Sequence, residues 1–522
     1  MKFFRRGFWP KLLIGLILLV QIIAVITLII LLADAAATNG PMLVLILIGI
    51  VFLGDVITAV TIINNDTPDV YKISWLFLVF LLPIAGLVMY IFLANKQTSK
   101  KNRRFLQRYS RPLLIVPNSD EEDKKIEELS PSGAAISRYI EKASGGAPHD
   151  QTSLEFFPLV DDAFPVILEE MKKAKHYIFL EFFIVSPGKM WDSMLAILEE
   201  KAKEGLDIRF IYDDVGSLGT ATHGYAEELT KKGIRTVVFN PLRPFLDVRM
   251  NNRDHRKILV IDGHTCFSGG FNLADEYINA EVRFGHWKDN AILLKGKAVT
   301  NFTMMFLANW VTNNDLNEDV DKDYYDSSTY IEEIGGYPKS EGFVQPYGDL
   351  PFDKEAVGET VYTQLLNRAN RYVYMTTPYL IIDAEMQRAC INAAKRGVDV
   401  RLIMPHIPDK NAVFHLSRSF YGKLMAAGVK VYEYTPGFVH EKMFICDDEM
   451  ATCGTINLDY RSLFLHLECG TFMVKTPCIA KMKEDYLDTV SLSHEVTREE
   501  WTRWREKNYF FWMTLRLLGP FL

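Results

Sequence analysis

Asp254-His-Arg-Lys-Ile-Leu-Val-Ile-Asp262 and Val439-His-Glu-Lys-Met-Phe-Ile-Cys-Asp447 are two segments with one pattern. In each, a histidine and a lysine stand two residues apart, and an apolar run then leads to an aspartate. Side chains two apart on an extended chain point to the same face of a sheet. The apolar runs predict buried strands, so each segment presents one imidazole and one ammonium on a common face.

A turn follows each of these strands at the same distance. Gly269-Gly-Phe-Asn272 and Gly454-Thr-Ile-Asn457 both begin seven residues after the motif aspartate. One such motif could arise by chance, but two copies with matching downstream turns indicate a shared function.

The surrounding sequence repeats in the same order. The segment Tyr177–Ile184 matches the segment that begins at Tyr372, and Lys203–Ile211 matches Lys395–Ile403. Strands alternate with helical patterns, which is typical of an α/β fold with helices on the faces of a sheet. We therefore predict a duplicated α/β domain whose halves lie near 151–335 and 336–498. The remaining regions are a membrane anchor (1–95), a linker (96–150) and an aromatic, basic C-terminal helix (499–522).

The residue types in the motifs suit transfer of a phosphoryl group. An uncharged imidazole can attack phosphorus and hold a covalent phosphohistidine, while a second imidazole protonates the leaving alkoxide and then activates the incoming alcohol. The ammoniums of Lys257 and Lys442 would hold the nonbridging oxygens. Asn272 and Asn457 could donate further hydrogen bonds. Each half supplies one histidine, His255 or His440, so the halves must meet, and the sequence leaves open which one attacks.

A carboxylate should hold each imidazole in the correct tautomer. As motif members, Asp262 and Asp447 are candidates for this catalytic role, but each stands at odd separation from its histidine and would face the other side of an extended strand. They could instead brace the strand and turn. Asp289 and Glu468, each just before an apolar strand, are better placed, and we predict that these two orient the histidines. The chemistry needs no metal or cofactor, and the sequence offers no convincing metal-ligand set.

Three apolar runs precede the repeats: Leu12–Ala33, Met42–Asn64 and Ile73–Asn95. Each has the length that a helix needs to cross a bilayer, ~20 residues. Pro83 lies within the third run, and proline is tolerated in membrane helices. The dense basic cluster after the third run favours the cytoplasm for the downstream chain. A multi-pass protein of the cell membrane is expected, with the number of crossings open.

Overall composition excludes several classes. The formal net charge is -7, which gives no general attraction to nucleic acid. The six cysteines are scattered without C-x-x-C spacing, which argues against a zinc site or a disulfide framework. Nothing in the sequence fixes the oligomeric state.

At the motif residues the sequence resembles the phospholipase D superfamily, and most closely its bacterial cardiolipin synthases. Supporting segments are Tyr212–Ser217, Asn272–Asn279, His286–Asp289, Thr376–Tyr379 and Asn457–Ser462. The resemblance implies two phospholipase D-like α/β sandwich domains packed together behind a transmembrane helical region. It further implies transfer of a phosphatidyl group between two phosphatidylglycerol molecules, with His255 as nucleophile and His440 as general acid and base.

Other functions share this chemistry. A phospholipase D-type hydrolase would pass the same intermediate to water, and a phosphatidylserine synthase would pass it to another alcohol. A non-catalytic membrane scaffold would tolerate decayed motifs, whereas both motifs are intact. Assay of the products formed from labelled phosphatidylglycerol separates these alternatives.

Overall fold

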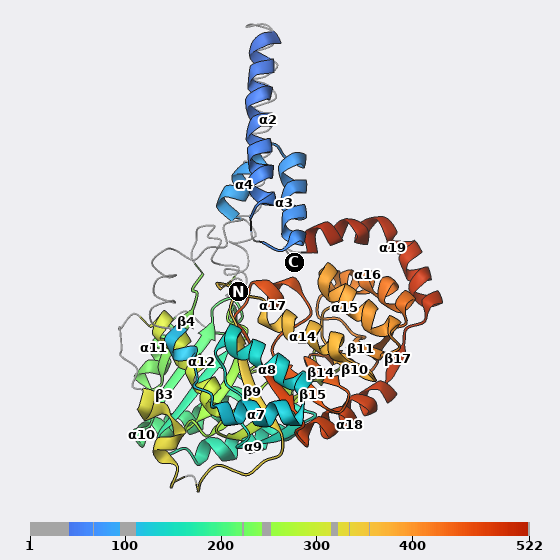
Figure 1. Cartoon of the computed structure of the whole chain (residues 1–522). Helices are drawn as coiled ribbons and strands as arrows, with labels where there is room; N and C mark the ends of the chain where they lie inside the picture. The colour runs from blue at the N-terminus through green and yellow to red at the C-terminus, as the bar shows by residue number, and fades with distance from the viewer. Residues whose placement is uncertain are drawn as a thin grey trace. The chain divides into compact units, whose positions relative to one another are not determined.

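The computed structural model describes residues 41–65, 67–93, 111–221, 224–242, 252–314, 322–333, 335–353 and 355–519 (Figure 1). The chain divides into two compact units, one formed by Met1–Lys96 with Arg243–Met250 and the other by Gln97–Leu242 with Asn251–Leu522. Both motifs and all predicted site residues belong to the second unit.

The first unit is helical where it is described. Helix α2 (Pro41–Ile63) contains Leu45–Ile63, which among the described residues is the one segment long and apolar enough to cross a membrane. Its mean hydropathy is 2.6, and only 22% of that segment is buried within the protein. An apolar helix surface left uncovered in this way suits lipid contact. The first predicted run, Leu12–Ala33, lies outside the described residues.

The third apolar run differs from the prediction of a continuous membrane helix. It forms α3 (Asp69–Leu81) and α4 (Ala85–Leu93), which are 13 and 9 residues long and are separated at Pro83. Proline lacks the N–H of a helical hydrogen bond and its ring clashes with the preceding turn. Ile84 adopts a φ of 67°, which completes the break. Neither helix reaches the length of a full crossing.

The second unit contains a seven-stranded sheet from the first repeat, in the order β1-β8-β6-β5-β2-β3-β4. Its strands are β1 (Thr152–Phe157), β2 (Tyr177–Phe182), β3 (Asp207–Asp213), β4 (Arg235–Phe239), β5 (Lys257–Ile261), β6 (Thr265–Gly269) and β8 (Ala291–Gly296). Strands β2, β3 and β4 are parallel and the others pair antiparallel.

The second repeat forms an eight-stranded sheet in the order β17-β12-β11-β10-β14-β15-β16-β9. Its strands are β9 (Phe343–Asp349), β10 (Tyr372–Thr376), β11 (Asp399–Pro405), β12 (Lys430–Tyr434), β14 (Met443–Cys446), β15 (Met450–Gly454), β16 (Glu468–Val474) and β17 (Ser493–Glu495). Apart from the added β17, the order is that of the first sheet strand for strand. The predicted duplicated α/β fold is therefore confirmed.

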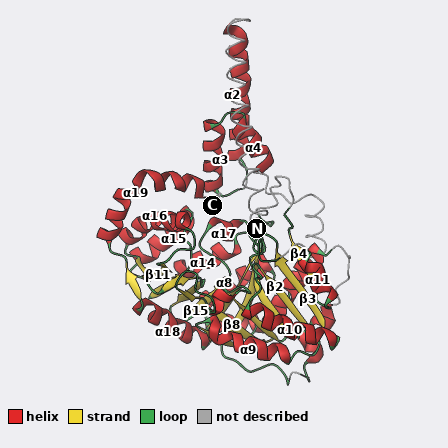
Figure 2. Ribbon diagram, turned by 180° about the vertical axis from the view of Figure 1, so that it is seen from behind, coloured by secondary structure: helices red, strands yellow, loops and turns green. Residues whose placement is uncertain are grey.

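The central strands β2, β5 and β6 of the first sheet are buried on both faces. Ile178 and Leu180 of β2 face a core shared with α9 (Val160–Lys172) and α10 (Lys189–Lys203). Tyr177 and Phe179 face the opposite core, which includes α12 (Val299–Asn313). Figure 2 shows helices around the strands of both halves.

That second core joins the two halves. It contains Phe179 and Phe302 from the first repeat together with Val344, Met443 and Cys469 from the second. Helix α18 (Cys478–Ser491) of the second half also packs on β1 of the first. One continuous apolar core therefore fixes the halves against each other, as a site shared between them requires.

The segment expected to be a linker is largely structured. Residues 111–144 form α6 (Arg111–Leu114), α7 (Asp120–Leu129) and α8 (Pro131–Ser144). Ile136 and Ile140 of α8 are fully buried, and the hydroxyl of Ser130 accepts the N–H of Gly133 at the start of that helix. Apolar residues at helical spacing inside a polar sequence explain why this part folds onto the second unit.

The C-terminal helix α19 (Arg498–Leu518) packs on α16 (Asn411–Ala427). The indole of Trp501 donates to the carbonyl of Arg418, and the ring of Trp504 stacks on His415 with centroids 6.0 Å apart. These contacts hold α19 against the second repeat.

Candidate active site

Each histidine is held in place by backbone pairing with the opposite half. The N–H of His255 donates to the carbonyl of Leu467 at 2.9 Å, and the N–H of Leu467 donates to the carbonyl of Arg253 at 2.8 Å. In the other half, the N–H of His440 donates to the carbonyl of Lys288 at 2.7 Å. There β13 (Gly437–Val439) pairs in parallel with β7 (His286–Lys288). The two connections are related by the internal repeat.

The same pairing brings each histidine to a carboxylate from the opposite half. Nδ1 of His255 lies 2.9 and 3.0 Å from the two carboxylate oxygens of Glu468. Nδ1 of His440 lies 2.7 Å from Oδ2 of Asp289. Both carboxylates have an exposed fraction of 0%. Both predicted carboxylates therefore contact a motif histidine, and each lies in the half opposite to its histidine.

These contacts determine which nitrogen of each ring is available. A carboxylate accepts a hydrogen bond, so Nδ1 of His255 carries the ring proton. Nδ1 of His440 lies 2.7 Å from Asp289 and 3.0 Å from the ammonium of Lys442, and the shorter contact with the carboxylate favours a proton on this Nδ1 as well. Nε2 is then left with its lone pair. Both rings are 7% exposed. The arrangement therefore offers two buried imidazoles whose Nε2 atoms are free of the carboxylates.

Two lysines complete a cluster of basic groups. Lys257 and Lys442 are 0% and 1% exposed, and each ammonium donates to the carbonyl oxygen of its own motif histidine. Burial lowers the pKa of Lys257 to about 7, assisted by the charge of Lys442. Burial likewise lowers the pKa of Lys442 to about 8. An anionic ligand between the two ammoniums would offset the free-energy cost of burying their charges.

The imidazoles are affected by the same charges. Burial, followed by the charges of Lys257 and Lys442, holds the pKa of His255 well below its usual range. Burial and Lys442 lower the pKa of His440 to about 4, although Asp289 acts in the opposite direction. Both rings are therefore neutral near pH 7, and charged groups from both halves contribute to lowering the pKa of His255.

The family follows from comparison with known proteins. The model for "Cardiolipin synthase, PLD-like domain" matches residues 167–310 and 362–489, which together are more than half of the chain. This chain belongs to the phospholipase D-like cardiolipin synthase family. A second model, described as "Phospholipase_D-nuclease N-terminal", matches residues 50–95 of this same chain.

Relatives matched over most of the chain agree with this membership, and a solved structure shares the fold. An uncharacterized protein of Streptococcus mutans is 40% identical over 463 residues, covering 88% of this chain and 98% of its own. A cardiolipin synthase of Halalkalibacterium halodurans is 31% identical over 491 residues, covering 92% and 94%. The crystal structure of Haemophilus influenzae phosphatidylserine synthase shares the fold at 15% identity, with a TM-score of 0.55 over 75% of this chain and 100% of that one.

The motif aspartates of this phospholipase D-like chain accept backbone hydrogen bonds, as expected for the alternative in which they brace the strand and turn. Asp262 accepts the backbone N–H groups of Lys175, His176 and Tyr177 at 2.8–2.9 Å. Asp447 accepts those of Asn370, Arg371 and Tyr372 at 2.7–2.9 Å. Five residues of extended chain place each about 16 Å beyond its lysine. Both have positive φ, which aspartate tolerates in turns, so they brace the fold.

The predicted asparagines have different surroundings. Asn272 accepts the N–H of Ile184 and donates to the hydroxyl of Tyr277 at 2.7 Å, which leaves one amide hydrogen. The ring of Tyr277 lies 5.5 Å from that of His440. Asn457 is 5% exposed, and its Oδ1 has no hydrogen-bond partner. Their contact with a phosphate remains a prediction.

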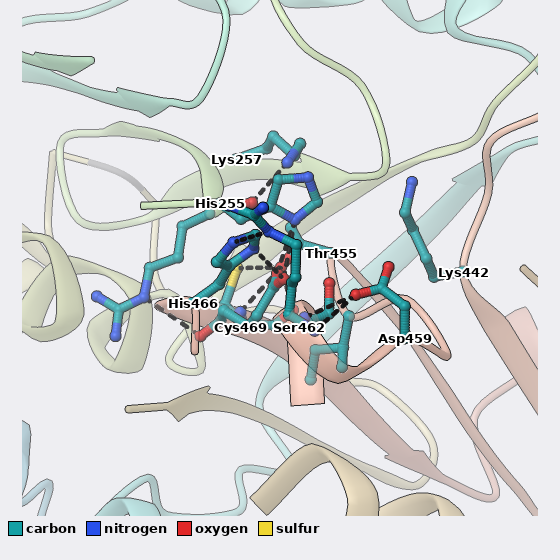
Figure 3. A network of polar contacts seen from close by, with 12 residues as sticks. His255, Lys257, Lys442, Thr455, Asp459, Ser462, His466 and Cys469 are labelled. Carbon is teal, nitrogen blue, oxygen red and sulfur yellow. Dashed lines mark hydrogen bonds and ion pairs between the residues drawn. The ribbon is translucent and has the colours of Figure 1, made fainter. Parts of the chain in front are cut away.

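Sequence reasoning missed two groups beside His255, shown in Figure 3. The hydroxyl of Thr455 donates to Glu468, and the ring of His466 lies 5.6 Å from that of His255. His466 is 9% exposed, so it is not a surface residue. The sequence does contain a signal for this position. His466 stands two residues before Glu468, so on an extended chain both side chains lie on the same face.

The two histidines therefore have unequal surroundings. Aromatic rings surround His440, with centroids at 5.4 Å for Trp287, 5.5 Å for Tyr277 and 5.9 Å for Phe438. His255 instead has Phe183 at 5.1 Å and the polar ring of His466. The repeat is symmetric in its backbone and asymmetric in the groups around its imidazoles.

His255, His466 and Glu468 are also the one group among the described residues with ligand atoms close enough for a metal, all within 4.8 Å. The hydrogen bonds do not favour one. Nε2 of His466 accepts from Nε of Arg461 at 3.3 Å, so Nδ1 of His466 carries the proton, as does Nδ1 of His255. A metal bound through these Nδ1 atoms would need their lone pairs, which the protons occupy.

Proposed function

We propose that this chain is a cardiolipin synthase, which transfers a phosphatidyl group from one phosphatidylglycerol to another and releases glycerol. It is a phosphatidyltransferase of the phospholipase D type. The observation that supports the proposal is the exchange of carboxylates between halves, together with the effect that the charges of Lys257, Lys442 and His440 have on His255. Relatives named cardiolipin synthase over most of their length support the substrate.

In the first step, Nε2 of His255 attacks the phosphorus of the donor phosphatidylglycerol. A P–N bond forms, the P–O bond to the glycerol headgroup breaks, and the proton on Nε2 of His440 passes to the leaving oxygen. The products are a phosphatidyl-histidine and free glycerol. Glu468 stabilises the positive charge that develops on the His255 ring through its hydrogen bond to Nδ1.

In the second step, a hydroxyl of the acceptor phosphatidylglycerol loses its proton to Nε2 of His440 and attacks the same phosphorus. The new P–O bond forms as the P–N bond breaks, which restores both histidines. Lys257 and Lys442 hold the nonbridging oxygens in both steps, and Asn272 and Asn457 add hydrogen bonds.

The assignment of roles rests on the surroundings of each ring. A nucleophile must be uncharged, and the pKa of His255 is held well below its usual range by burial and both lysines. His440 must be protonated when the donor reacts. Burial and Lys442 lower its pKa to about 4 in the empty site. An anionic phosphodiester between the lysines offsets their charge, so protonation of His440 would accompany donor binding.

We further propose two membrane crossings, by Leu12–Ala33 and α2. The second compact unit, which contains both motifs and is called the catalytic unit below, would then lie in the cytoplasm. Breakage of the third run at Pro83 supports this count. Two crossings place the basic N-terminus and the basic cluster after residue 95 on the same side, as the positive-inside rule favours. Labelling of single cysteines placed at residue 4 and residue 100 with an impermeant reagent tests the arrangement: protection of both in intact cells supports it.

Incubation of the purified full-length chain with phosphatidylglycerol labelled in its glycerol headgroup tests the function. Cardiolipin and free glycerol in equal amounts support the proposal. Phosphatidic acid as the sole lipid product would instead identify a phospholipase D-type hydrolase, because water then takes the intermediate. Loss of all turnover in His255→Ala and in His440→Ala is expected, and turnover retained by either variant would contradict the mechanism.

A further inference from the structure

Two cations in the catalytic unit lie one or two side chains from the histidines and have no part in the chemistry described above. Lys410 precedes α16 and is exposed. Arg461 is half-buried in α17 (Tyr460–Phe464). Among the described residues, neither forms an ion pair with a carboxylate within 4.0 Å. Because both cations lack an anionic partner within the described part of the chain and lie near the histidines, they are candidates to bind a second anionic group of the substrate.

Lys410 is connected to the His440 side through aromatic rings. Its ammonium lies 5.6 Å from the centre of the Tyr379 ring, whose hydroxyl donates to Asp409. The Tyr379 ring lies 6.5 Å from Phe438, and Phe438 lies 5.9 Å from His440. The charge of Lys410 also reaches the other histidine, since it contributes to lowering the pKa of His255 after burial and the nearer cations.

Arg461 is connected to the His255 side. Its Nε donates to Nε2 of His466 at 3.3 Å, and His466 lies 5.6 Å from His255. This bond uses one of the five N–H groups of a guanidinium, and the remaining four suit a phosphate.

Asp459 lies within electrostatic range of both cations. Burial raises its pKa, and the charges of Arg461 and Lys410 oppose that shift. Its carboxylate accepts the backbone N–H groups of Arg461 and Ser462, both at 2.9 Å, so its charge is already partly compensated. Lys410 and Arg461 therefore keep positive charge available for a ligand.

We propose that Lys410 and Arg461 form a subsite for the phosphodiester of the acceptor lipid, separate from the reacting phosphate held at Lys257 and Lys442. The inference rests on the proposed function. The acceptor carries its own phosphate a short glycerol bridge away from the hydroxyl that attacks, whereas water and free glycerol carry none. The subsite would thus favour a phospholipid acceptor over water.

The test compares two reactions of one enzyme. Cardiolipin formation from phosphatidylglycerol needs an acceptor phosphate. Exchange of labelled free glycerol into phosphatidylglycerol uses the same donor and intermediate but no acceptor phosphate. Lys410→Met keeps the apolar stem on Tyr379, and Arg461→Gln removes the guanidinium. We expect each to lower the ratio of cardiolipin formation to glycerol exchange by about tenfold, as loss of one charged contact implies.

Two further variants separate charge from structure. Arg461→Lys keeps the positive charge, so its ratio of cardiolipin formation to glycerol exchange should be close to that of the wild type. If Arg461 served only to hold His466, the ratio in Arg461→Lys would be as low as in Arg461→Gln. Lys423→Ala removes an exposed lysine from the far part of α16 and should keep the wild-type ratio.

The outcomes are decisive in both directions. A low ratio in Lys410→Met and Arg461→Gln, recovered by Arg461→Lys, supports the subsite. An unchanged ratio overturns it, and so does a parallel fall in both reactions, which would indicate binding to the membrane surface or damage to the catalytic cluster. If the wild-type chain makes no cardiolipin at all, the proposed function fails, and the subsite fails with it.

Discussion

Replacement of Glu468 by glutamine removes one negative charge from beside His255 and almost no volume. The carboxylate is fully buried and accepts Nδ1 of His255 at 2.9 and 3.0 Å, as well as the hydroxyl of Thr455. A hydrogen bond to a charged group contributes roughly 1.5–3 kcal/mol. That range corresponds to a loss of about tenfold to 150-fold in kcat/KM. The amide of glutamine can also donate to Nδ1, which would place the ring proton on Nε2 and block attack.

The assay is the rate of cardiolipin formation in mixed micelles, together with thermal unfolding. Thr471→Ser is the matched control, because Thr471 is a buried residue of the same strand at odd separation from Glu468. We expect Glu468→Gln to melt within a few degrees of the wild type while losing activity, and the control to keep both. Activity of Glu468→Gln within twofold of wild type would refute the orienting role.

Three further predictions concern other parts of the site. Asp262→Asn and Asp447→Asn should each lower the free energy of unfolding by about 2–4 kcal/mol by weakening three backbone hydrogen bonds, while the folded fraction keeps its specific activity; activity lost from fully folded protein would return them to the catalytic set. Lysine is charged below its pKa, so kcat/KM should fall as pH rises through about 7 to 8 with loss of the protons of Lys257 and Lys442, and a rate still rising above pH 9 would contradict this. Activity should persist after dialysis against a chelator, and loss that Zn²⁺ or Mg²⁺ restores would show that a metal is needed.

The repeat and the strand order follow from local sequence features. Apolar runs such as Lys257–Ile261 and Met443–Cys446 are buried on both faces, and that property is visible in the residues alone. The choice of Asp289 and Glu468 as orienting carboxylates was predictable for a similar reason, since each stands next to an apolar strand in its half.

The exchange of partners between halves was not predictable in the same way. It depends on the contacts of Leu467 with Arg253 and of β13 with β7, which join segments more than a hundred residues apart. No local pattern specifies such contacts. The break at Pro83 was missed because a proline within an apolar run is compatible with a continuous membrane helix or with two short ones. The helices of 111–144 were missed because their polar, charged sequence is also typical of a linker.

The covalent step can be observed directly with an activated donor, a phosphatidyl ester of p-nitrophenol. This leaving group needs no proton from His440, so His440→Ala should still form the intermediate. We expect His440→Ala to release a burst of p-nitrophenol equal to the enzyme concentration, with the phosphatidyl group recovered on a peptide containing His255, and we expect no burst from His255→Ala. A burst from His255→Ala, or an adduct on any other residue, would contradict it.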